Sequence, residues 1–66
     1  MLTAEFNANT GMAHLCEIDH YYDVKCNIGG FTRIVQLLED KYGKMSMHSV
    51  SKHIIIAIGG TTHDDN

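Results

Sequence analysis

The sequence predicts a small α+β domain: a mostly antiparallel sheet of three to five strands, ordered β-β-β-α-β with room for an extra strand, and one helix packed on one face. Three observations support this. Residues 2–7 alternate apolar and polar side chains, residues 31–42 repeat apolar side chains at helical spacing, and residues 53–60 are the most apolar and β-branched run. We therefore expect a single domain over residues 1–60 and a flexible polar tail at 61–66.

The first part of the chain is predicted to form a three-stranded meander. Strands at residues 2–7, 12–18 and 21–28 are separated by a turn rich in Asn and Gly and by the pair Asp19-His20. A two-residue loop at that pair places Ile18 opposite Tyr21 and gathers the apolar side chains on one face. This core face is predicted to hold Leu2, Ala4, Phe6, Ala13, Leu15, Tyr22, Val24, Cys26 and Ile28.

A helix is predicted near residues 31–42, because apolar side chains recur there at intervals of three and four. Gly43 suits the residue after the helix, since glycine adopts the left-handed conformation common at that position. At the other end, a glycine of the pair Gly29-Gly30 is the best N-cap that we identify. The predicted apolar stripe consists of Phe31, Ile34, Val35, Leu38 and Tyr42.

The isoleucine run is predicted to be a strand with two apolar faces. Ile54, Ile56 and Ile58 point to one side, because side chains alternate along a strand. Ile55 and Ala57 point to the other side. Such a strand is typical of the interior of a sheet, or of an edge that needs a partner.

Residues 45–50, just before this run, are interpreted as a short additional strand; the alternative is that they join the isoleucine run in one long bent strand. Because the helix covers one face only, we expect the other face to stay open. This face is apolar enough that we expect it to bind a partner. The expected open face carries His14, Cys16, Ile18, Tyr21 and Ile55.

Charge and composition exclude several classes of function. The 66 residues carry a net charge of −3, and residues 1–24 hold four acidic side chains without Lys or Arg. This balance argues against direct nucleic-acid binding, which needs a basic face, and allows an acidic patch that meets a basic protein. No apolar run is long enough to span a membrane, and two cysteines are too few for a disulfide scaffold. We therefore expect a cytoplasmic protein with reduced thiols and no membrane association.

Four potential zinc ligands occur in the first hairpin, at His14, Cys16, His20 and Cys26. The predicted register points Cys16 outward and Cys26 inward, so the two thiols could neither share one ion nor form a disulfide. We therefore expect no metal ion and no cofactor, and keep a small metal-binding protein as the second alternative function.

The sequence does not predict an enzyme. His14 and Cys16 lie two residues apart and could form a base and nucleophile pair, but we identify neither a third orienting group nor an oxyanion hole. Residues 59–62, Gly-Gly-Thr-Thr, follow an apolar strand as a phosphate loop would, yet lack its lysine and the following helix.

By elimination, the sequence favours a non-enzymatic protein-binding module. A small acidic domain without catalytic residues is similar, as a class only, to the inhibitors that phages and mobile elements direct against host machinery, anti-CRISPR proteins among them. Its acidic hairpin would block a basic channel of a host protein or protein–nucleic acid complex. The predicted contact residues are Glu5, His14, Cys16, Ile18, Tyr21, Asp23 and Lys25.

The first alternative is a structural or accessory domain that forms a homodimer. Two copies would pair through an edge strand or through the open face of the sheet.

Overall fold

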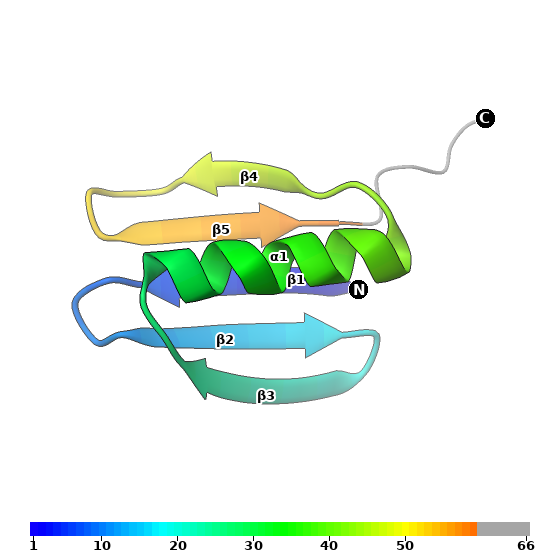
Figure 1. The fold of residues 1–66 in the computed structure, drawn as a ribbon, viewed down its shortest axis with the longest axis horizontal. Coiled ribbons are helices and arrows are strands. Elements are labelled where there is room, and N and C mark those ends of the chain that lie inside the picture. The colour runs from blue at the N-terminus through cyan, green and yellow to red at the C-terminus, as the bar shows by residue number, and fades with distance from the viewer. Residues whose placement is uncertain (60–66) are drawn as a thin grey trace.

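The computed structural model describes residues 1–59 and shows one antiparallel sheet with a helix lying across one of its faces (Figure 1). The described elements are β1 (Leu2–Asn7), β2 (Met12–Glu17), β3 (His20–Lys25), α1 (Ile28–Tyr42), β4 (Ser46–Ser49) and β5 (Ile54–Ile58). In space the five strands follow the order β3-β2-β1-β5-β4. The predicted fold class is therefore confirmed, and the predicted tail at 61–66 lies outside the described residues.

The register of β1 with β2 agrees with the prediction from the sequence. Ala4 pairs with Leu15 and Phe6 pairs with Ala13, and all four side chains are buried on the side of the helix. β1 alternates apolar and polar residues, and Ala13 and Leu15 of β2 lie two residues apart, so this register places both apolar sets on one face.

The predicted pairing of β2 with β3 is wrong by two residues, although the predicted faces are right. Tyr21 pairs with Cys16 rather than with Ile18, because the two-residue turn is Ile18-Asp19 and not Asp19-His20. Side chains alternate with a period of two, so a shift of two residues leaves each on its predicted face. The third strand also ends earlier than predicted, since Ile28 already begins the helix.

The turn between β2 and β3 holds a strained residue. Ile18 has a φ of 63° and is, within the described chain, the one residue other than glycine with a positive φ. Glycine usually takes the first position of such a turn, because a β-branched side chain collides with the backbone there. The Ile18 side chain is nevertheless 62% exposed, so little burial of its own offsets the strain.

Helix α1 begins three residues earlier than predicted, and the predicted glycine N-cap is wrong. The cap is Asn27, whose side-chain oxygen accepts a hydrogen bond of 2.8 Å from the Gly30 N–H. Asn is among the best N-cap residues because its short side chain satisfies a free N–H of the first turn. At the other end Gly43 is the C-cap as predicted, and its N–H donates to the Glu39 carbonyl at 2.8 Å.

The core lies between α1 and the covered face of the sheet. At its centre Phe31 is fully buried and stacks on Phe6, with ring centroids 5.3 Å apart. Met45, just before β4, closes one end of this core, whereas Met47 is 48% exposed. The buried cluster consists of Leu2, Ala4, Phe6, Ala13, Leu15, Phe31, Val35, Leu38, Met45 and Ala57.

Strand β5 lies inside the sheet, between β1 and β4, which is one of the two positions that its apolar faces allowed. The separate short strand predicted for residues 45–50 is also present, as β4. The expectation that Ile55 lies on the open face is wrong: Ile55 pairs with Phe6, and directly opposed residues share a face, so Ile55 points to the helix. Ile54, Ile56 and Ile58 consequently occupy the open face.

Glu17, at the end of β2, joins the first hairpin to the last turn of α1. Its carboxylate accepts hydrogen bonds from the hydroxyl groups of Tyr22 and Tyr42, the latter at 2.7 Å, and lies 3.4 Å from Lys41 Nζ. The bond from Tyr22, then those from Tyr42 and Lys41, lower the pKa of Glu17 from its ordinary value of 4.5 to about 2. The same bond raises the pKa of Tyr22 to about 12.

We predict that Ile18→Asn increases the free energy of unfolding by about 1 kcal/mol, because Asn adopts the left-handed conformation with less strain. Chemical denaturation followed by circular dichroism measures the change. Val50→Asn replaces a side chain of similar exposure, 59%, at ordinary φ. This control should stay within about 0.5 kcal/mol of the parent protein. An Ile18→Asn protein no more stable than the parent would show that the turn stores no strain.

We also predict that Glu17 stabilises the fold in a pH-dependent way. Since folding lowers its pKa, its contribution is complete above pH 4.5 and is lost as the pH falls toward 2. The thermal midpoint of Glu17→Gln should lie below that of the parent at neutral pH, and the difference should shrink through that acidic range. Asp40→Asn, at an exposed helix position, is the control. A difference of constant size across the range would contradict the assignment.

Candidate functional site

The strand register arranges the open face in rows, because directly opposed residues of neighbouring strands point to the same side. The middle row runs across all five strands from β4 to β3 and contains His48, Ile56, Glu5, His14 and Asp23. The row on one side of it contains Ser46, Ile58, Thr3, Cys16 and Tyr21. The row on the other side contains Ile54, Asn7, Met12 and Lys25.

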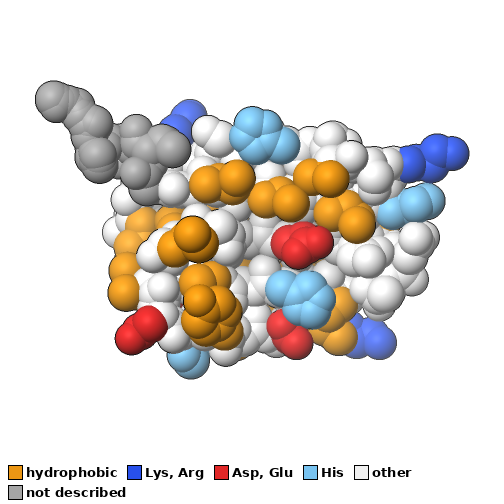
Figure 2. Space-filling view, turned by 180° about the vertical axis from the view of Figure 1, so that it is seen from behind, with side chains coloured by type: hydrophobic (Ala, Val, Ile, Leu, Met, Phe, Trp, Pro, Cys, Tyr) orange, Lys and Arg blue, Asp and Glu red, His pale blue; other side chains and the backbone are white. Residues whose placement is uncertain are grey.

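Three isoleucines of β5, Ile54, Ile56 and Ile58, form an aliphatic strip on this face, which we call the isoleucine strip. None of the three is fully buried, and Ile58 is 40% exposed. Figure 2, which views the molecule from behind, shows hydrophobic side chains gathered beside acidic and histidine side chains. In the described part of the chain, no element covers this face.

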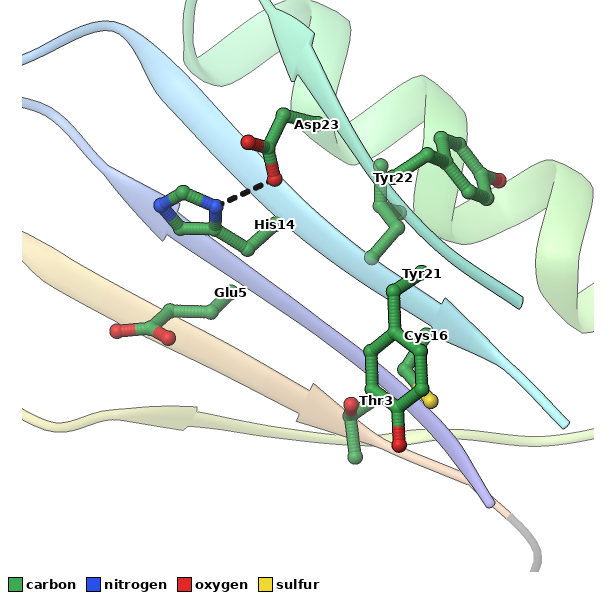
Figure 3. Close-up of a pocket in the computed structure, with 8 residues that line it drawn as sticks. Thr3, Glu5, His14, Cys16, Tyr21, Tyr22 and Asp23 are labelled. Atoms are coloured by element: carbon green, nitrogen blue, oxygen red, sulfur yellow. Dashed lines mark hydrogen bonds and ion pairs between the residues drawn. The ribbon is translucent and has the colours of Figure 1, made fainter. Parts of the chain in front are cut away.

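Next to the strip lies a shallow hollow of about 270 Å³ over β1, β2 and β3 (Figure 3). Its floor includes the buried side chain of Cys16, whereas Leu15, which also lines the hollow, points its side chain to the helix. Acidic, histidine and aromatic side chains stand around that floor. The lining residues are Thr3, Glu5, His14, Leu15, Cys16, Tyr21, Tyr22 and Asp23.

At one side of the hollow, His14 Nδ1 of β2 lies 2.6 Å from Asp23 Oδ1 of β3. An ionised carboxylate only accepts hydrogen bonds, so the ring donates from Nδ1, and a neutral ring keeps Nε2 as an acceptor. The two side chains are 55% and 60% exposed, so the pair contributes little to stability. Its effect is to fix the orientation of both groups above the sheet.

Tyr21 is 75% exposed and stands beside Cys16, its partner on β2 (Figure 3). The neighbouring Cys16 side chain raises the pKa of Tyr21 above its ordinary value of 10.0, and the phenol remains protonated at neutral pH. The site thus presents a neutral, exposed aromatic ring.

Five of the seven residues predicted to make contacts line the hollow: Glu5, His14, Cys16, Tyr21 and Asp23. Lys25 shares their face but stands one row from Asp23. Ile18 lies in the turn at the end of the hairpin.

The sequence reasoning missed Thr3 and the isoleucine strip. Alternation in residues 54–58 was the available signal, but both of its faces are apolar. Only the pairing of β5 with β1 decides which face is open.

The two cysteines lie on opposite faces of the sheet, and both are free thiols. His20 is on the covered side, with its ring 5.1 Å from that of Tyr22. Within residues 1–59, no three His, Cys, Asp or Glu side chains lie close enough together to hold a metal ion.

For the pair of His14 and Cys16, the structure supplies an orienting group that the sequence did not reveal, namely Asp23. The thiol of Cys16, however, lies 3.7 Å from the carbonyl oxygens of Met1 and Ile18 and donates to them. Cys16 is 5% exposed and His14 turns toward Asp23, so the two side chains do not form a hydrogen-bonded base and nucleophile pair.

Within residues 1–59, no helix combines the length and the apolar character required to cross a bilayer. Comparison with family models, with curated proteins and with solved structures gives no match. A function therefore has to be inferred from the open face itself.

Proposed function

We propose that the chain is a non-enzymatic protein-binding module that binds its partner through the open face of the sheet. One observation carries the proposal: an aliphatic strip shares the open face with a hollow lined by two carboxylates, a histidine and an exposed tyrosine, and Glu5 of that hollow pairs directly with Ile56 of the strip. Removing apolar surface from water is favourable by about 25 cal/mol per Å², so a partner that covers the strip gains binding free energy. The surrounding polar groups would give orientation and specificity.

The charge at the centre of the face favours a partner other than a second copy of the chain. Glu5 is half-buried in the middle of the central strand, β1. In a face-to-face dimer centred on β1, this carboxylate would meet its own symmetry copy. Two desolvated like charges destabilise such an interface, whereas a basic group of another protein would neutralise Glu5.

Nucleic-acid-binding proteins are partners that offer such a surface, since their channels are basic. The proposed activity is therefore inhibition: the acidic first hairpin and the open face occupy a basic channel of a host nucleic-acid-binding complex. This steric and electrostatic mode of action is the one that the class-level similarity to inhibitors of phages and mobile elements implies. The net charge of −3 and the acidic residues of the first hairpin support this proposal.

Capture from a lysate of the source cells, quantified by mass spectrometry, tests the proposal. We predict that Asp23→Lys and Tyr21→Ala each weaken binding of one specific protein roughly tenfold, because each removes a contact in the hollow of the open face. Asp40→Lys makes the same charge change, and Leu37→Ala also truncates a large side chain, on exposed positions of α1; both should bind like the parent. Calorimetry with the purified partner then gives the affinities, and displacement of its nucleic acid tests inhibition.

Undiminished binding by Asp23→Lys and Tyr21→Ala would show that the contact surface does not lie on the open face. Light scattering provides a second check on the parent protein. A tight dimer whose formation protects the open face from hydrogen exchange would favour the homodimeric alternative. If the partner forms the complex but still binds its nucleic acid, the chain is a binding module and not an inhibitor.

A further inference from the structure

The hollow on the open face is rich in hydrogen-bond acceptors. Its lining residues include the carboxylates of Glu5 and Asp23 but no Lys or Arg. His14 donates from Nδ1 to Asp23, and its Nε2 adds a further acceptor when the ring is neutral. Lys25, the nearest cation on this face of β3, stands in a neighbouring row. The hollow therefore favours a ligand group that is cationic and carries several donors.

The shape and the apolar parts of the hollow further restrict which cationic group it can bind. The Tyr21 ring forms one wall, and a cation over an aromatic face is attracted by the ring. The buried Cys16 side chain gives the hollow an apolar floor against which an aliphatic stem can lie. Glu5 and Asp23 belong to β1 and β3, on either side of β2, so a single compact charge would not satisfy both.

We infer that this hollow receives an arginine side chain of the partner protein, with an aliphatic neighbour of that arginine seated on the isoleucine strip. The inference rests on the proposed function and specifies the chemistry of the partner. A guanidinium is planar, always charged, and offers five N–H donors in a wide fork. It would donate to Asp23 and Glu5 and lie against the Tyr21 ring.

The register explains why an aliphatic residue should accompany the arginine. Glu5 is the direct cross-strand partner of Ile56, and Thr3 is that of Ile58. Neighbouring strands are about 5 Å apart, so a group in the hollow has the isoleucine strip within reach of the next side chains along its own chain. A segment with leucine beside arginine covers both surfaces at once.

Nuclear magnetic resonance titration of the full chain with blocked peptides tests this inference without the natural partner. The probe is acetyl-Gly-Leu-Arg-Leu-Gly-amide, and its counterparts carry citrulline or lysine in place of arginine. We expect the arginine peptide to shift amide signals around residues 3–5, 14–16 and 21–23 in a saturable manner. The lysine peptide should bind at least roughly threefold more weakly, and the uncharged citrulline peptide more weakly still.

Variants locate the site of binding. Glu5→Gln and Asp23→Asn should each weaken the arginine peptide roughly threefold, the size expected for an exposed ion pair. Asp40→Asn, which removes one carboxylate on the helix side, should leave the affinity unchanged. The undisturbed signals of each variant show that it is folded.

Equal binding of the arginine and citrulline peptides would overturn the inference, as would shifts confined to other parts of the chain or no shift at millimolar peptide. The proposed function would fail differently. If Tyr21→Ala abolishes binding of a protein partner while the arginine and citrulline peptides bind alike, the open face is a protein-binding surface. The inference that it receives an arginine would then be wrong.

Discussion

Burial of the apolar stripe of α1 against the middle of the sheet is the interaction on which the rest of the structure depends. Phe31 is fully buried and stacks on Phe6 of the central strand, with the ring centroids 5.3 Å apart. This contact determines which face of β1 is covered. Because paired residues share a face, the strand register then fixes the covered face of β2, β5 and the edge strands as well. A helix that covers one face of a sheet necessarily leaves the opposite side chains to solvent or to another molecule.

The local elements could be predicted from the sequence because their patterns are local. Residues 2–7 alternate cleanly, and the spacing of the helix stripe is regular. The turn between β2 and β3 was misplaced, since an isoleucine at positive φ contradicts the usual preference for glycine. The helix start was predicted too late because Gly29 and Gly30 have a low helix propensity, although Asn27 before them is the N-cap.

Features that depend on distant pairing could not be predicted in this way. The face of Ile55 follows from its pairing with Phe6, almost fifty residues away, and the isoleucine run is apolar on both sides. Glu17 counted only as one of several acids in the sequence, yet it accepts a hydrogen bond from Tyr42, at the far end of the helix. Most residues predicted for the site nevertheless line one hollow, because the alternation of β1, β2 and β3 was read correctly.

The first residue of the chain is held against the turn that follows β2. Ile18 donates from its backbone N–H to the Met1 carbonyl at 2.8 Å, and that carbonyl also accepts from the Cys16 thiol. Gly59 bonds to Leu2 at 2.9 Å, so both ends of the described chain lie at one end of the sheet. An affinity tag fused before Met1 would therefore emerge beside Tyr21 and crowd the hollow, which makes the choice of fusion site part of any binding measurement.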